Sequence, residues 1–298
     1  MALAILWVIA FHFAMYGNLL RYPLVDFIAG QGYLGVDVFF FLSAYGLCFS
    51  FNSNTPGEFY KRRFIKLYPV YLVFLAAYLL FFSKGLAISW WKFLLLQVSG
   101  LSSFSSLEIE WFIPALTILY LTFPLLYRLV EKVYGWGLAA CSVLFLLSVA
   151  GGYLLSGSVL CLFPLRFPII ILGIMTYLAM RGGNLRFLCG IYVLAAVTGV
   201  LCTGLSRINV SLSGSLVVPL LLFGLGQTGL RAPDWKVMTF VGAHTLEIYL
   251  AQNIAFNHYM SSSPLPFVTN SLVSIGIVLA GSAVLIVVQN LPKWIKVC

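Results

Sequence analysis

The residues best suited to chemistry are ionisable side chains that stand within or beside long apolar runs. His12, Asp37 and Glu247 each lie in such a run, and Glu110 directly precedes another. An imidazole can act as a general base, and a nearby carboxylate can orient the ring and stabilise its charged form. Because ionisable groups in an apolar medium are costly and are usually kept for function, each of these side chains is a candidate.

Each candidate also has a structural alternative. His12 could form a hydrogen bond between two helices, and Asp37 and Glu110 could be solvated near a membrane surface. Arg166 also lies in an apolar run and could extend its guanidinium to lipid headgroups. Glu247 is harder to explain in this way, because a carboxylate at mid-depth needs a partner or a proton.

The composition places these residues in a membrane protein. Of the 298 residues 62% are apolar and 8% are charged, whereas soluble domains are about 45–50% apolar and about 25% charged. With a mean hydropathy of +1.03, these values exclude an ordinary soluble protein, a disordered chain and a coiled coil. The six cysteines include no CxxC pair, which excludes a disulfide scaffold and offers no spacing for a metal site.

The elements that carry these residues are expected to be membrane-spanning helices, each of which needs about 20 apolar residues. We expect an all-α polytopic protein with about ten spans and a single domain over 1–298. The segment 88–98 is too short to span and is expected at the membrane interface, where tryptophan is favoured. The expected spans are 2–20, 33–51, 64–83, 111–129, 137–155, 160–180, 188–205, 210–229, 237–260 and 268–291.

The basic residues predict the orientation of these spans. With the N-terminus in the cytoplasm, the inner loops hold twelve of the 17 Lys and Arg residues and the outer loops hold four. This asymmetry follows the positive-inside rule, and an even number of spans then places both termini in the cytoplasm. The net charge of +9 is therefore explained by topology, and we expect a lipid bilayer and no nucleic acid as partner.

The densest basic cluster is the expected inner loop 59–71, with Lys61, Arg62, Arg63 and Lys66. Guanidinium groups bind phosphate through paired hydrogen bonds, so the cluster could bind a phosphorylated cytosolic ligand. It could equally be a topological anchor or an attachment to anionic lipid headgroups. The spacing alone does not choose between these interpretations.

Five segments in order resemble the acyltransferase 3 family of bacterial membrane enzymes. The GVDVFFFLSAY segment, for example, is similar to the family pattern G-V-D-x-F-F-x-L-S-G-F. Each motif is mostly apolar, but the five together span nearly the whole chain. They are AILWVIAFHF (4–13), GVDVFFFLSAY (35–45), FYKRRFIKLYP (59–69), EWFIPALTILYLTFP (110–124) and TLEIYL (245–250).

The resemblance implies about ten helices in a bacterial plasma (inner) membrane and an acyl-transfer activity. The acyl group, often acetyl, would come from cytosolic acyl-CoA as a co-substrate, with no tightly bound cofactor. The acceptor would be a hydroxyl of a cell-surface polysaccharide or a lipid-linked glycan. The resemblance leaves the oligomeric state open.

The resemblance also suggests roles for the candidate residues. His12 would be the general base, with Glu110 or Asp37 as its orienting carboxylate. The CoA phosphates would be held by Arg62, Arg63 and Lys66. The acceptor side would be shaped by Trp111, Glu247, Tyr249 and Ser43, of which Ser43 has no base beside it and is not expected to be a nucleophile.

The chain departs from the family pattern at four positions. Met1 stands where the family often has an arginine, eleven residues before His12. Either the natural chain begins further upstream, which we expect, or this chain lacks a cation that would grip CoA. Ala44 replaces a glycine, Lys66 replaces an arginine, and Gln252 lies near the place of a common histidine.

Two other functions remain open. In a transporter or glycan exporter, the intramembrane charges would line a path for a substrate instead of doing chemistry. In a non-catalytic relative, the chain would keep the fold as an assembly partner in the membrane, and the changes at Met1 and Gln252 favour that interpretation.

Overall fold

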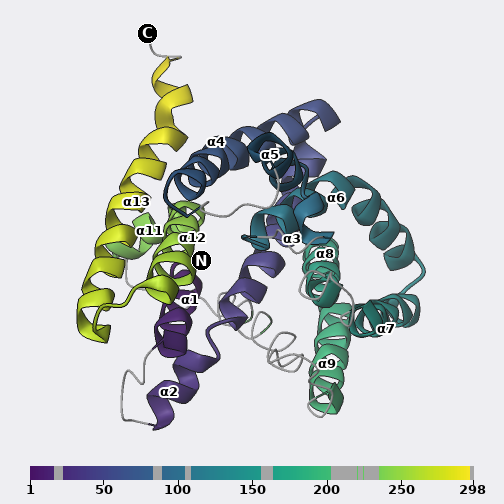
Figure 1. Ribbon diagram of the computed structural model, residues 1–298. Helices are drawn as coiled ribbons and strands as arrows, with labels where there is room; N and C mark the ends of the chain where they lie inside the picture. The colour runs from purple at the N-terminus through teal and green to yellow at the C-terminus, as the bar shows by residue number, and fades with distance from the viewer. Residues whose placement is uncertain are drawn as a thin grey trace. The chain divides into compact units, whose positions relative to one another are not determined.

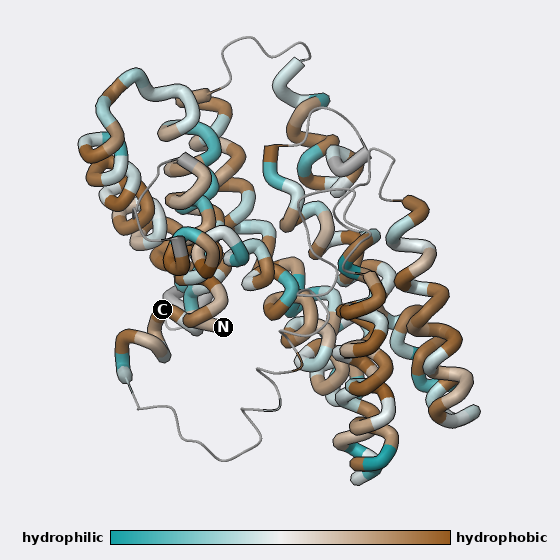
Figure 2. Tube along the Cα trace, turned by 90° about the horizontal axis from the view of Figure 1, so that it is seen from below, coloured by the Kyte–Doolittle hydropathy of each residue, from teal (hydrophilic) through white to brown (hydrophobic). Residues whose placement is uncertain are grey.

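The computed structural model describes residues 1–16, 23–82, 89–104, 109–155, 164–202, 220, 224 and 235–295. Every regular element within these residues is helical (Figure 1), which confirms the all-α prediction. Six helical stretches are long and apolar enough to cross a membrane, and hydrophobic residues run along much of the described chain (Figure 2). The expected count of ten stays a prediction, and the expected span 210–229 lies almost wholly outside the described residues.

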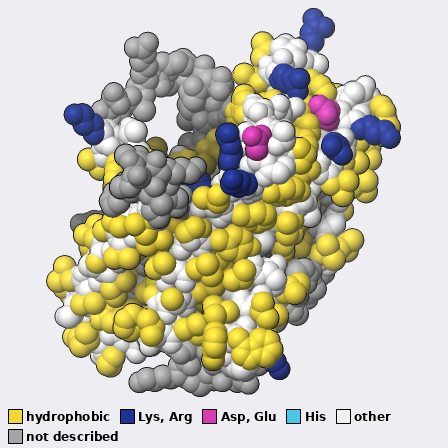
Figure 3. Space-filling view, turned by 90° about the horizontal axis from the view of Figure 1, so that it is seen from above, with side chains coloured by type: hydrophobic (Ala, Val, Ile, Leu, Met, Phe, Trp, Pro, Cys, Tyr) yellow, Lys and Arg dark blue, Asp and Glu magenta, His cyan; other side chains and the backbone are white. Residues whose placement is uncertain are grey.

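Long apolar runs form these helices because a helix satisfies its backbone hydrogen bonds within one segment, as lipid requires. Hydrophobic side chains accordingly cover much of the visible surface in Figure 3. The six long stretches are α3 (Leu34–Ser53), α4 (Pro56–Phe82), α6 (Phe112–Gly135), α7 (Leu138–Leu155), η2 with α8 (Pro164–Arg181) and α13 (Phe267–Leu291 within Phe267–Ile295). The shorter elements are α1 (Ala2–Tyr16), α2 (Pro23–Gly30), α5 (Trp90–Ser99), η1 (Leu101–Phe104), α9 (Leu185–Leu201), α11 (Lys236–Ala243), α12 (Thr245–Asn253) and η4 (Ile254–Met260).

The described helices form two compact units. The first comprises residues 1–35, 61–98 and 232–298, and the second comprises 36–60 and 99–231. The prediction of a single domain over the whole chain stays a prediction.

In the first unit, α1 packs against α2, α11 and α12, and α12 packs against α13 (Figure 1). Two glycines permit the close approach of α1, because a Cβ added at Gly32 or Gly35 would collide with the carbonyl oxygen of Trp7 or Ala4. The Trp7 indole donates a hydrogen bond of 2.6 Å to the Ile28 carbonyl, which fixes α2 beside α1.

Helix α5 lies antiparallel along α4 within the first unit. The Phe93 ring stacks on Tyr78 with centroids 5.8 Å apart, whereas the Tyr68 hydroxyl, nearer the start of α4, donates to the Val98 carbonyl at 2.7 Å. These contacts attach α5 to α4 near both of its ends. That this short helix lies at the membrane interface stays a prediction.

Two local expectations are wrong. The basic segment 59–71 is not a loop, because it lies inside α4. The expected span 237–260 is not one continuous α-helix: it breaks at His244, which has φ −113° and ψ 30°, and its last part is the π-helix η4. The break at His244 leaves the composition of the run 237–260 mostly apolar, so the sequence pattern did not reveal it.

In the second unit, α6, α7, α8 and α9 pack on one another, and α8 is buried along nearly its whole length. Gly173 brings α8 against α3, since a Cβ at this position would lie 2.7 Å from the Phe41 carbonyl oxygen and 2.9 Å from the Ala44 Cβ. Helix α8 is therefore the central helix of this unit, and Arg166 lies at its N-terminus.

Candidate functional site

His12 is held in one ring orientation by its own helix. Its Nδ1 lies 2.9 Å from the carbonyl oxygen of Val8, one turn earlier in α1. Because a carbonyl can only accept, Nδ1 carries the proton in this bond. In the neutral ring the lone pair is therefore on Nε2, which is the arrangement that a general base needs.

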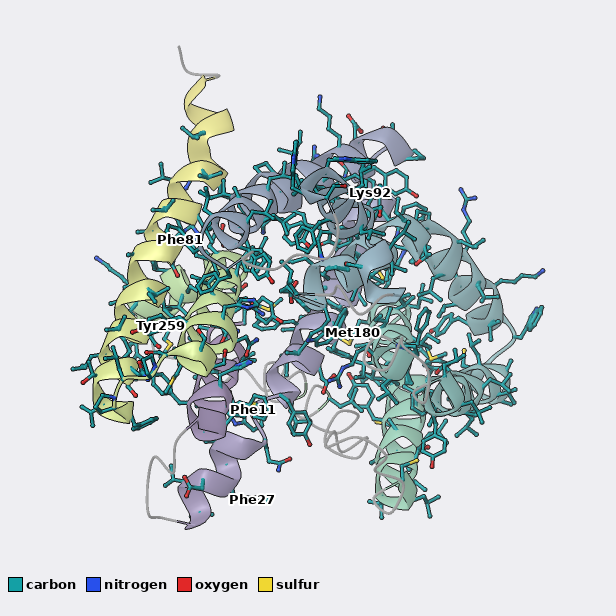
Figure 4. The ribbon with its side chains drawn as sticks, in the orientation of Figure 1. Phe11, Phe27, Phe81, Lys92, Met180 and Tyr259 are labelled. Atoms are coloured by element: carbon teal, nitrogen blue, oxygen red, sulfur yellow. The ribbon has the colours of Figure 1, made fainter. Side chains whose placement is uncertain are left out.

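Aromatic side chains from two helices clamp the His12 ring. Phe256 of η4 stacks on it with centroids 6.1 Å apart and planes 19° apart, and Phe11 meets it edge-on at 5.3 Å. Phe13 packs against Phe256 at 4.6 Å. Figure 4 labels Phe11 on α1 and Tyr259 on η4, the two elements that form this clamp. The ring is thus fixed by packing as well as by its hydrogen bond.

The π-helix η4 is also held from α4. The His258 ring lies 4.9 Å from the Tyr78 ring and 5.5 Å from the Phe82 ring. π-helical turns are rare and occur often at functional sites. Here the turn carries Phe256 to α1 and His258 to α4, so it positions one aromatic contact of His12.

Glu247 is buried in α12 with 2% of its surface exposed. The His244 ring lies near it, with Nδ1 3.8 Å from Glu247 Oε1, which is too long for a hydrogen bond. Within the described residues Glu247 Oε2 has no hydrogen-bond partner. The sequence-based prediction that this carboxylate needs a partner or a proton therefore fits its position. His244 was missed, although its spacing of three residues from Glu247 on a helix is a usable signal.

The basic side chains of α4 share one side of that helix. Arg62 and Lys66 are four residues apart, and at about 100° per residue Arg63 falls within the same third of the helix circumference. Lys61 lies outside this sector. Arg62 and Lys66 are exposed and Arg63 is half-buried, so the sector can bind a phosphate group from one direction.

Asp37 and Arg166 form a buried ion pair in the second unit. Asp37 lies in the first turn of α3, Arg166 ends η2, and their exposed fractions are 0% and 2%. The Arg166 guanidinium also lies over the Trp111 ring, 5.8 Å from its centroid. Neither solvation of Asp37 nor extension of Arg166 to the lipid surface describes this arrangement.

Glu110 caps helix α6. Its two carboxylate oxygens accept hydrogen bonds of 2.7 Å from the backbone amides of Phe112 and Ile113. These amides have no partner within the helix, and a negative charge at a helix N-terminus is favourable. The carboxylate is buried and firmly oriented, and its neighbour Trp111 faces the Asp37–Arg166 pair.

The predicted residues are divided between the two units. The first unit contains His12, Glu247, buried Tyr249 and the basic sector of α4. The second unit holds Asp37, Glu110, Trp111 and half-buried Ser43. That Asp37 or Glu110 orients His12 stays a prediction. In the part of the chain that the structure describes, no three His, Cys, Asp or Glu side chains gather to hold a metal ion.

Comparison with known families gives one match that covers almost the whole chain. Residues 2–288 match the model of the acyltransferase 3 family, which is described as an acyltransferase domain. No curated protein and no solved structure matches the chain.

Proposed function

Because the chain belongs to the acyltransferase 3 family and is a multi-pass membrane protein, we propose that it is a membrane-bound O-acyltransferase. It transfers an acyl group, acetyl in the first instance, from acyl-CoA to a hydroxyl of a cell-surface polysaccharide or lipid-linked glycan. The membrane is the bacterial plasma (inner) membrane. The observation that carries the proposal is the His12 ring, with Nδ1 bonded to Val8 and Nε2 left with the lone pair.

The proposed chemistry uses His12 as the base. Nε2 takes the proton of the acceptor hydroxyl while the hydroxyl oxygen attacks the thioester carbonyl carbon. The C–S bond then breaks, and the CoA thiolate leaves and receives that proton. A positioned base of this kind contributes a rate factor of about 10²–10⁴.

Arg62, Arg63 and Lys66 bind the phosphates of CoA in this proposal, since they share one side of α4. In this proposal the Val8 carbonyl orients the imidazole, and the negative charge of Asp37 or Glu110 stabilises the imidazolium that forms during transfer. Trp111, Ser43, Glu247 and Tyr249 contact the acceptor. The resemblance of the motifs that contain these residues supports the assignment.

The test measures transfer of labelled acetyl from acetyl-CoA to cell glycans by membranes that contain equal amounts of each variant. We expect His12→Phe to lower transfer by about 10²–10⁴. The matched control is His258→Phe, which keeps an aromatic ring against Tyr78 and Phe82 and is expected to leave transfer near the wild-type rate. Transfer that survives His12→Phe would contradict the role of His12. Wild-type protein that moves glycan across the membrane without acylating it would favour an exporter.

A further inference from the structure

Gln252 is a buried amide with nothing to bind in the described part of the chain. Its side chain in α12 has 0% of its surface exposed, and neither Oε1 nor Nε2 has a hydrogen-bond partner among the described residues. Proteins rarely leave a buried polar group unpaired, because removing it from water without a new partner is costly. Such a group indicates a ligand that supplies the missing hydrogen bonds.

Gln252 lies close to the proposed base. It precedes Phe256 by four residues, so the two side chains share one side of the helix. The Phe256 ring is the one that stacks on His12, and α1 contacts both α12 and η4. Gln252 is therefore about one helical turn along the chain from Phe256, the residue that stacks on the imidazole.

The facing helix offers a second unpaired group at the same level. Gly281 of α13 lies against Ala251, since a Cβ added there would be 3.2 Å from the Ala251 Cβ. The next residue, Ser282, is buried and its Oγ has no partner among the described residues. The adjacent Asn253 is buried with an unpaired Oδ1. Buried polar atoms without partners among the described residues thus occur on both α12 and α13.

We propose that the Gln252 Nε2–H donates a hydrogen bond to the acyl carbonyl oxygen of the donor and stabilises the charge that develops on it. This inference rests on the proposed acyl transfer. When the acceptor oxygen bonds to the carbonyl carbon, the C=O electron pair moves to the carbonyl oxygen, which Gln252 then binds while His12 Nε2 holds the proton. When the C–S bond breaks, the carbonyl re-forms and the thiolate takes the proton.

The chemistry of the side chain suits this role. A base acts within about 2.6–3.2 Å of the hydroxyl oxygen, and an oxyanion donor lies about 2.7–3.1 Å from the developing charge. Both groups must reach one carbonyl, and Gln252 and the Phe256 that stacks on His12 lie in one continuous helical stretch. A carboxamide in a site without water is also among the groups that stabilise such an oxyanion.

The kinetic test replaces Gln252 by Met, which keeps the length of the side chain and removes the amide. We expect kcat for acetyl transfer to fall about 10²–10³-fold, with KM for acetyl-CoA changed less than about threefold. Gln252→Glu, which keeps the shape and loses the donor, should fall similarly. The matched control is Gln97→Met, because Gln97 is equally buried in the first unit but already accepts from the Tyr71 hydroxyl at 3.3 Å. Its kcat should stay at the wild-type value.

A spectroscopic test separates direct contact from a structural effect. In the His12→Phe background, where transfer is blocked, the infrared C=O stretch of bound acetyl-CoA labelled with ¹³C at the carbonyl should lie at lower frequency with Gln252 than with Met. Equal frequencies, or a Gln252→Met enzyme that retains the wild-type kcat, would overturn the inference and leave the acyltransferase proposal standing. A wild-type protein that transfers no acyl group at all would instead overturn the proposed function, and this inference with it.

Discussion

Arg166 and Asp37 show how much a buried charge depends on its partner. Each is almost completely buried, and each neutralises the other. Removing one charge of such a pair leaves the other uncompensated in a medium of low dielectric constant. The pair joins the start of α3 to the N-terminus of α8, so its loss affects the centre of the second unit.

We expect Arg166→Met to lower the free energy of unfolding by about 3–5 kcal/mol, measured by thermal unfolding of the purified protein in detergent. The double variant Asp37→Asn with Arg166→Met should be more stable than Arg166→Met alone, because no unpaired charge then remains. Asp37→Asn completes the double-mutant cycle. If the losses of stability in the two single variants simply add in the double variant, the two side chains do not interact.

A second prediction at this scale concerns Glu110, whose carboxylate binds two backbone amides. Glu110→Ala should destabilise the protein by about 0.5–2 kcal/mol, as the loss of a helix cap does. Glu110→Gln keeps one acceptor oxygen and should lose less. If Glu110→Gln also keeps the full rate of acetyl transfer, the Glu110 carboxylate acts as a helix cap alone and takes no part in catalysis.

The basic segment 59–71 is part of helix α4, and this determines where its basic side chains lie. Once these residues are helical, their order along the chain becomes a position around the circumference. Arg62, Arg63 and Lys66 then fall within about 100° of one another, whereas Lys61 lies about 140° from Lys66 and about 160° from Arg63. In a loop of the same composition, nothing would separate Lys61 from the other three basic residues in this way.

If the basic sector of α4 binds acyl-CoA, substitutions inside and outside the sector should affect binding differently. Arg62→Ala should raise KM for acetyl-CoA by about 10–100-fold, because a hydrogen bond to a charged group is worth about 1.5–3 kcal/mol. Lys61→Ala removes the same charge from the neighbouring position and should leave KM unchanged. If KM for acetyl-CoA rose equally in Arg62→Ala and Lys61→Ala, the effect would be a general electrostatic one. Such increases in KM would disappear at high salt.

The sequence predicts which segments span the membrane, but it does not predict how they pack. The long runs that form α3, α6 and α13 are predominantly apolar, and length and hydropathy alone identify them as spans. The same uniformity hides how they pack, because a helix that is apolar all round has no pattern to mark its buried side. The pairing of Asp37 with Arg166, the break at His244 and the stacking of Phe256 on His12 depend on such packing, so they appear only in the structure.

The orientation of the molecule in the membrane is predicted from its charges. The inner loops of the proposed topology hold twelve Lys and Arg residues and the outer loops four, so the positive-inside rule predicts that the start of α4 lies in the cytoplasm and the start of α5 outside. Both ends offer an exposed lysine for labelling, Lys61 and Lys92.

This orientation is tested with single cysteines at the two lysines, in a chain whose six native cysteines are replaced by alanine. In intact spheroplasts, a membrane-impermeant maleimide should label Lys92→Cys and not Lys61→Cys, and in inverted vesicles the labelling should be reversed. Detergent should expose both, which controls for reactivity. Labelling of Lys61→Cys from outside would place the basic sector away from cytosolic acyl-CoA. The phosphate-binding role of Arg62 would then fail, while the helical packing around His12 would be unaffected, because that packing lies within one unit and does not depend on the direction of insertion.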